Sequence, residues 1–199
     1  MPNFMLLTKT HPFLHSVLRQ MIDKGRMDDA RAIAAKYRFV PHFSHSLELL
    51  LHEALEEDPS YKLHKQSKKS GGEAVDPKKS LLFPVVDFLN KFKQFPEVVV
   101  HCARKTDPAK WDYLFLIVGN PERLFEQCLK AGNVLMCANY LRILQETQDL
   151  IVARRAAIKV LDLTLQNDNL ELLADLMRFL EPLDAPEQNG KQNGKKAKE

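Results

Sequence analysis

Apolar residues recur every three or four positions along most of the chain, and this spacing favours helices over any other element. The most regular example carries apolar residues on one side only, at Leu47, Leu50, Leu51, Ala54 and Leu55. Glutamates occupy the other sides of that segment. Because similar stripes follow one another, the sequence predicts an all-α fold of about ten helices.

Capping residues and prolines indicate where these helices begin. Asp107-Pro108 and Asn120-Pro121 each place a polar N-cap side chain before a proline, whose missing N–H costs nothing in a first turn. Ser44 and Ser80 are further candidate N-caps. The run Val98–Val100 could form a buried strand, but the sequence offers no second strand to pair with it, so we expect a helix.

We expect these helices to form an α-solenoid-like stack of antiparallel hairpins. Small residues that would let paired helices approach closely follow three of the turns, at Ala30, Ala138 and Ala174. Residues 1–57 should form the N-terminal hairpins, and residues 80–182 the main stack, continuous with them. Residues 58–79 have the composition of a flexible lysine-rich linker, and residues 183–199 that of a disordered tail.

The formal net charge of +3 lies outside the expected helical body. Residues 58–79 hold six lysines and three acidic residues, residues 183–199 hold four lysines and three acidic residues, and the remainder carries a charge of −1. A nearly neutral body does not suit phosphate contacts, so we expect no nucleic-acid partner. The lysines of residues 58–79 could instead make a weak contact with an anionic membrane.

No residue pattern indicates bond-making chemistry. The three cysteines lack the spacing of a zinc site and read as reduced core thiols: Cys102, Cys128 and Cys137. Three histidines lie close in sequence without the His-Glu-x-x-His arrangement: His42, His45 and His52. The sequence shows no glycine-rich phosphate loop and no Gly-x-Ser-x-Gly motif. We therefore expect no metal, no cofactor and no catalytic residue. The lack of an apolar leader or a membrane-length apolar run favours a cytosolic protein.

Two groups of side chains are candidates for a protein interface. Glu53, Glu56 and Glu57 could form an acidic patch, although a solvated helix face is the simpler explanation. Trp111 and Tyr113 could contribute aromatic contacts to a partner, although core packing explains them more simply.

Four stretches of the sequence carry a family resemblance. They are Leu47–Glu57, Val98–Asp107 with its continuation Trp111–Phe115, Val118–Leu129, and Ala138–Gln145. In this order they resemble the C-terminal helical domain of the ribosome-control-protein-one (Ric-one) family. Family members begin with β-propeller repeats that are missing here, so the chain resembles an excised C-terminal fragment. The insert at residues 58–79 also looks longer than the family pattern.

The resemblance implies a docking role. Ric-one proteins are the large subunit of a two-protein guanine nucleotide exchange factor for the Golgi Rab-six/Ypt-six GTPase, and their partner is the arrestin-like Rgp-one subunit. Exchange factors bind the nucleotide-free GTPase more tightly than its nucleotide-bound form, which requires surfaces rather than bond-making groups. We therefore expect a helical domain that docks the partner subunit, the GTPase or both, peripherally at Golgi membranes. The alternative is a coat- or tether-type trafficking scaffold without exchange activity.

Arg104, Lys105 and Trp111 lie within the most specific of these stretches and are the candidate docking residues. We expect the two basic side chains in the last turn of one helix and Trp111 near the first turn of the next. A structural role is the alternative for the basic pair, because cations at a helix C-terminus complement the helix dipole.

Overall fold

The structure is a computed structural model that describes residues 13–70, 76–167 and 170–184. Throughout these residues it contains helices and no strand, as the apolar period predicts. The α-helices are α1 (Leu14–Asp23), α2 (Met27–Tyr37), α3 (Phe43–Glu57), α4 (Ser60–Ser70), α5 (Leu82–Leu89), α6 (Phe95–Lys105), α7 (Trp111–Val118), α8 (Pro121–Lys130), α9 (Val134–Thr147), α10 (Leu150–Gln166) and α11 (Leu170–Asp184). Two short 3₁₀ helices, η1 (Pro77–Lys79) and η2 (Pro108–Lys110), precede α5 and α7.

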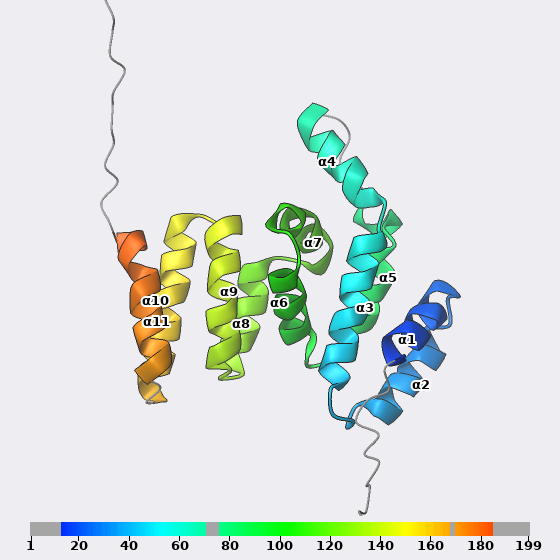
Figure 1. Cartoon of the computed structure of the whole chain (residues 1–199), viewed down its shortest axis with the longest axis horizontal. Helices are drawn as coiled ribbons and strands as arrows, with labels where there is room; N and C mark the ends of the chain where they lie inside the picture. The colour runs from blue at the N-terminus through cyan, green and yellow to red at the C-terminus, as the bar shows by residue number, and fades with distance from the viewer. Residues whose placement is uncertain (1–12, 71–75, 168–169, 185–199) are drawn as a thin grey trace, which may run out of the picture.

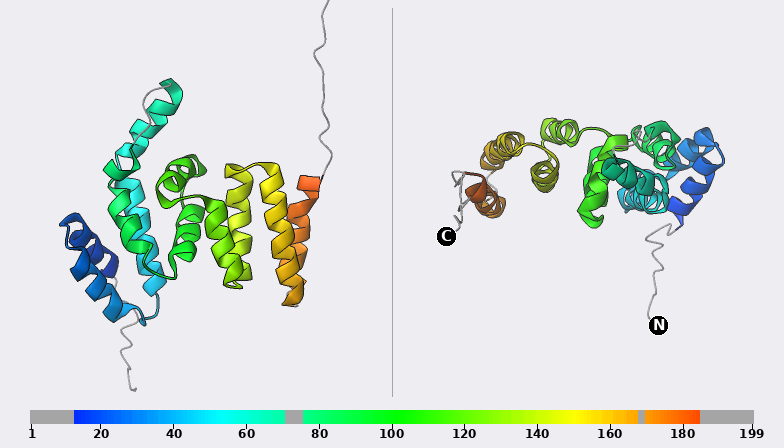
Figure 2. Two further views of the ribbon diagram at one scale, coloured as in Figure 1. Left: turned by 180° about the vertical axis from the view of Figure 1, so that it is seen from behind. Right: turned by 90° about the horizontal axis from the view of Figure 1, so that it is seen from above.

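The helices are stacked in a row. Helix α1 packs on α2 and α3, α3 packs on α5 and α6, and α6 packs on α8 and α9. Helices α9, α10 and α11 then continue the row to its other end (Figure 1). Seen from above, the row is elongated rather than round (Figure 2). The expected α-solenoid-like stack is thus confirmed.

The centre of the stack is formed by helices that are apolar on several sides. All three valines of Val98–Val100 are buried in α6, because α6 has neighbours in α3, α8 and α9. Helix α5 buries Leu82, Val85, Val86, Phe88 and Leu89. The valine run is therefore a buried helix, as expected from the lack of a strand partner.

Two of the hairpin turns are built in the same way. Gly25 and Gly132 have φ values of +72° and +69°, which residues with a Cβ rarely adopt. After α1, the Gly25 N–H donates to the Ile22 carbonyl and the Arg26 N–H donates to the Met21 carbonyl, which is a Schellman motif. The same pair of hydrogen bonds follows α8. These turns reverse the chain and set the antiparallel pairs.

The small residues after the three turns differ in how deeply they are buried. Ala30 is fully buried and Ala138 is half-buried, which fits close helix packing. Ala174, however, is exposed on α11, so the expectation of a third close approach there was wrong. The turn residue assigned to that hairpin, Asp168, lies outside the described residues.

Residues 58–79 differ most from expectation. The composition indicated a flexible linker, but residues 60–70 form α4 and residues 77–79 form η1. The side chains of Tyr61 and His64 pack against the ring of Tyr113 in α7, at centroid distances of 6.0 and 5.5 Å. Residues 60–70 and 77–79 are thus helical where the composition indicated a flexible linker, and the contacts of Tyr61 and His64 with Tyr113 connect α4 to α7.

The expected ends of two helices also need correction. Ser44 lies inside α3, whose N-cap is His42 in the left-handed conformation at φ +69°. Helix α5 begins at Leu82 rather than at Ser80, although the Ser80 hydroxyl does accept a hydrogen bond from the Leu82 N–H at 3.0 Å. Of the expected tail, Leu183 and Asp184 belong to α11, and residues 185–199 lie outside the described residues.

Candidate functional site

The candidate docking residues lie where the sequence places them. Arg104 and Lys105 occupy the last turn of α6, and Trp111 is the first residue of α7. Between them, the Asp107 carboxylate accepts a hydrogen bond from the Ala109 N–H at 2.9 Å, which starts η2. The backbone at this tip thus agrees with the prediction that Asp107-Pro108 starts a helix. This agreement concerns the fold and does not bear on the docking role.

Trp111 is a core residue rather than an exposed contact. Its side chain is buried, and its indole N–H donates to the Ala103 carbonyl at 2.9 Å. This hydrogen bond ties the first turn of α7 to the last turn of α6. Trp111 can therefore shape a binding surface only as part of its wall.

The Arg104 side chain lines a groove that lies between the tip of α6 and α7 on one side and α9 on the other. Its guanidinium donates to the Asn139 side-chain oxygen at 2.8 Å. The groove has a volume of about 360 Å³, and its lining includes Arg104, Thr106, Trp111, Asn139 and Arg142. Its lining contains two arginines and no acidic residue. Two guanidinium groups beside an apolar wall are suited to binding a carboxylate of another protein.

A second groove adjoins the first along α9. It has a volume of about 290 Å³ and shares Ala138, Asn139 and Arg142 with the basic groove. Its other wall comes from α11 and is mainly apolar, with Leu172, Leu176 and Phe179. The one acidic residue of this wall, Asp175, is paired with Arg178. We call the two together the α9 groove; it combines a basic end with an apolar end. Sequence reasoning identified Arg104 but missed Arg142, because only the fold brings α9 beside the end of α6.

Lys105 points away from this groove. Its ammonium group lies 2.6 Å from a carboxylate oxygen of Glu48 in α3. The Glu48 side chain is only 9% exposed, and His45 lies 3.5 Å from its other oxygen. Lys105 therefore neutralises a nearly buried carboxylate, so the two basic residues of the tip have different surroundings.

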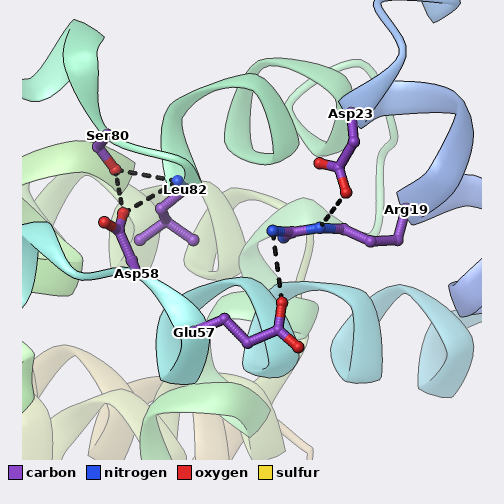
Figure 3. A network of polar contacts seen from close by, with 6 residues as sticks. All are labelled: Arg19, Asp23, Glu57, Asp58, Ser80 and Leu82. Atoms are coloured by element: carbon purple, nitrogen blue, oxygen red, sulfur yellow. Dashed lines mark hydrogen bonds and ion pairs between the residues drawn. The ribbon is translucent and has the colours of Figure 1, made fainter.

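The glutamates of the candidate acidic patch on α3 form contacts with other helices of the same chain. Glu53 lies 3.0 Å from His15 of α1, and Glu57 lies 3.6 Å from Arg19 of the same helix (Figure 3 shows the second pair). Glu56 accepts a hydrogen bond from Lys110 of η2 at 2.5 Å. These glutamates join α3 to its neighbours and do not meet Arg104. The structure thus separates the two groups of candidate residues.

Asp58 forms a polar centre that the sequence reasoning missed. Its carboxylate accepts hydrogen bonds from the Ser80 hydroxyl at 2.5 Å, the Leu82 N–H at 3.1 Å and the Tyr113 hydroxyl at 2.9 Å (Figure 3 shows the first two). The Ser60 N–H donates to its other oxygen at 2.9 Å. Burial alone would raise the pKa of Asp58, but the hydrogen bonds from Ser80, Ser60 and Tyr113 outweigh it and lower that pKa. The carboxylate joins α3, α4, α5 and α7. The missed signal is Asp58-Pro59, another polar residue before a proline.

The cysteines and histidines do not assemble into a site in the described part of the chain. Cys102, Cys128 and Cys137 are buried free thiols, and burial raises their pKa values to about 12, 11 and 12. No three His, Cys, Asp or Glu side chains among the described residues are grouped to hold a metal ion. Nor does any described helix have the length and apolar character to cross a membrane.

Comparison with known proteins places the chain in a family. The family described as the RIC1 C-terminal alpha solenoid region matches residues 15–199. The chain is 38% identical over 175 residues to the guanine nucleotide exchange factor subunit RIC1 of Mus musculus and to that of Homo sapiens. It is 34% identical over 167 residues to the guanine nucleotide exchange factor subunit R06F6.8 of Caenorhabditis elegans.

These alignments cover most of this chain but little of its relatives. The matches with the mouse and human proteins span 88% of this chain and 12% of theirs, and the nematode match spans 84% and 10%. No solved structure matches the chain. The match to the family over residues 15–199, together with these identities, shows that the chain belongs to the RIC1 family, in the part described as its C-terminal α-solenoid region.

Proposed function

We propose that the chain is a non-catalytic interaction domain of an exchange-factor subunit that acts on a Golgi Rab-six/Ypt-six-type GTPase in vesicle trafficking. The relatives are named as guanine nucleotide exchange factor subunits, which supports the coarser part of this proposal. The domain docks the arrestin-like Rgp-one-type subunit, the GTPase or both, and acts peripherally at Golgi membranes.

The α9 groove is the observation that carries this proposal. It places Arg104 and Arg142 at one end and the apolar side chains of Leu172, Leu176 and Phe179 at the other. A partner segment with an acidic side chain followed by apolar ones would complement both ends. The walls belong to helices that pack on shared neighbours, since α9 packs on α6 and both α9 and α11 pack on α10.

A pull-down with nucleotide-free and GTP-loaded Rab-six tests the function. The chain is presented together with the Rgp-one-type subunit, since either protein could supply the contact. An exchange factor retains the nucleotide-free GTPase selectively, because differential affinity is how it promotes nucleotide release. Equal retention of both forms would instead support the coat- or tether-type scaffold.

Substitutions in the groove test the surface separately from the function. Arg104→Ala combined with Arg142→Ala should weaken binding of the partner subunit or GTPase by about tenfold or more, or ~1.4 kcal/mol. Arg123→Ala is the matched control, because Arg123 is an exposed arginine of α8 outside the groove. Unchanged affinity in a folded double variant would remove the α9 groove from the interface.

The proposed contact with anionic membrane involves α4. This helix projects from the row of the other helices (Figure 1), and Lys62 and Lys65 are exposed on it. Each lysine near an anionic surface contributes about 1 kcal/mol to attraction. Flotation with phosphatidylserine-containing liposomes should decrease when both lysines are changed to serine. Flotation that is the same for both proteins would refute the contact.

A further inference from the structure

Helix α10 exposes an apolar stripe on the side opposite its neighbours. Ile151, Ile158 and Leu165 are spaced by seven residues, and their exposed fractions are 71%, 45% and 53%. At 3.6 residues per turn, seven residues are close to two turns, so the three side chains lie almost in line along the helix. The other side of α10 packs on α9 and α11 through small residues such as Ala153 and Ala157. The stripe therefore lies outside the contacts through which α10 packs on α9 and α11.

Two opposite charges accompany the stripe. Arg155 precedes Ile158 by three residues, and Asp162 follows it by four. Both side chains are exposed, and the helical period places them on the same flank of the stripe. One end of the flank is thus basic and the other end is acidic.

This arrangement is complementary to itself when the helix direction is reversed. If a second α10 lies antiparallel, with the two-fold axis passing beside Ile158, then Ile158 meets its own copy and Ile151 meets Leu165 of the second copy. The two-fold axis keeps the charged flanks on the same side, so Arg155 lies beside Asp162 of the second copy, and the reverse contact forms as well. An interface of this kind is isologous, because each copy supplies the same patch.

We propose that α10 is a self-association surface, on which a second copy of this chain packs antiparallel through Ile151, Ile158 and Leu165 with two Arg155–Asp162 ion pairs. This inference goes beyond the proposed function and does not depend on it.

The rest of the chain offers no better occupant for the stripe. Residues 185–199 contain no large apolar side chain that could cover it. Residues 1–12 do contain apolar side chains, but they are joined to α1, at the opposite end of the row from α10 (Figure 1). A single helix face is smaller than the roughly 800 Å² per partner of a standard interface, so we expect a weak dimer that dissociates on dilution.

Charge reversal gives a sharp test. In sedimentation velocity on the whole 199-residue chain, the wild type should show a dimer fraction that rises with concentration. Arg155→Glu alone and Asp162→Lys alone should each weaken the dimer by about tenfold or more, because each creates two like-charge contacts. A mixture of the two single variants should form a heterodimer, since the carboxylate introduced into one copy then meets the ammonium group introduced into the other. The double variant should dimerise by itself again.

Two further variants separate self-association from folding. Ile158→Asp should abolish the dimer while the helical circular dichroism is retained, because Ile158 is exposed within one copy. Leu116→Asp is the matched control, since Leu116 is 43% exposed on α7, away from the stripe, and its dimer should equal that of the wild type. A wild type that stays monomeric at the highest concentrations, or a mixture of single variants that does not associate, would overturn the proposal.

Discussion

The central helices and the C-terminal hairpin follow the same helical plan but are held together differently. Among the described residues, the largest fully buried side chains all belong to helices from α1 to α9, and they include Phe88, Tyr113, Phe125 and Tyr140. Helix α10 instead buries small residues such as Ala153, Ala157 and Val160. In a solenoid, each unit is stabilised mainly by its neighbours. We therefore expect α10 and α11 to open more easily than the centre.

Polar contacts enlarge this difference. Helix α3 is joined to α1, α6 and η2 by ion pairs, and Asp58 joins its end to three further helices. On the C-terminal side, Lys159 of α10 pairs with Glu126 of α8. The comparison shows that a stack of similar hairpins can combine a firmly connected centre with a simpler end.

The largest expected effect comes from truncating the central core. Leu51→Ala should lower the free energy of unfolding by about 2–5 kcal/mol, because Leu51 is fully buried in α3 and its removal leaves a cavity. Val160→Ala, also at a fully buried position, should cost only about 1–2 kcal/mol, since fewer methyl groups are lost. Urea unfolding followed by circular dichroism measures both. Equal losses would contradict the expected dependence of the loss on the number of methyl groups removed.

A smaller but still marked effect is expected at Asp58. Asp58→Ala leaves the Ser80 and Tyr113 hydroxyls without this acceptor, whereas the Leu82 N–H keeps the Ser80 hydroxyl as a partner. Each unsatisfied buried group costs about 1–3 kcal/mol. Relaxation and water entry reduce the sum, so we expect a loss of about 2–4 kcal/mol. Glu146→Ala is a control on an exposed carboxylate of α9, outside the self-association surface, and should change stability little.

The same carboxylate predicts a pH dependence. Its pKa is lower in the folded chain than the unfolded value of about 3.9. The fold thus favours the ionised form, so its stabilisation is complete above that value and is lost as the pH falls through the folded pKa. Below a pH of about 4, the difference in stability between the wild type and Asp58→Asn should therefore narrow. A difference that stays constant down to acid unfolding would show that ionisation of Asp58 contributes nothing.

At the tip of α6, a modest effect is expected from Lys105. Lys105→Ala removes the cation beside the nearly buried Glu48 and should cost about 0.5–1 kcal/mol in thermal or urea unfolding. Arg104→Ala should cost less, because Arg104 bonds to the neutral amide of Asn139 and not to a nearly buried carboxylate. The reverse order would mean that the contact between Arg104 and α9 contributes more to the stack than the ion pair.

The smallest effect is expected on α4. Lys62→Ser with Lys65→Ser changes two exposed side chains and should alter stability by no more than about 0.5 kcal/mol. Tyr61→Ala should cost clearly more, because the ring of Tyr61 packs against Tyr113. Melting temperatures of the two variants distinguish an ordered α4 from the linker expected from composition; equal melting temperatures would contradict the packing of α4.

The regular apolar period predicted the solenoid class and the helices other than α4, and capping residues and prolines predicted several of the helix ends. Composition did not indicate the helix at residues 60–70, because it averages over a segment in which Asp58 and Tyr61 make specific contacts. A local signal was nevertheless present. The side chain before the proline accepts a hydrogen bond from an N–H two residues on at Asp58, Asp76, Asp107 and Asn120 alike, at 2.8–3.0 Å.

The candidate site was less predictable than the fold. Arg104 and Asn139 are 35 residues apart, and their contact depends on how α9 packs beside α6. A single sequence does not show that α9 packs beside α6. The contacts of the α3 glutamates were unpredictable for the same reason, since their partners on α1 and η2 come from other parts of the chain.

The three buried thiols allow the rates at which the helices of the stack separate to be measured. A thiol reacts with an alkylating reagent as its thiolate, and burial suppresses both ionisation and access for Cys102, Cys128 and Cys137. Each cysteine therefore reacts only when the helices around it separate. Cys102 lies in α6, at the centre of the stack, whereas Cys137 lies in α9, next to the C-terminal hairpin. The ratio of their alkylation rates, read by mass spectrometry, would show whether the solenoid opens from one end or all at once.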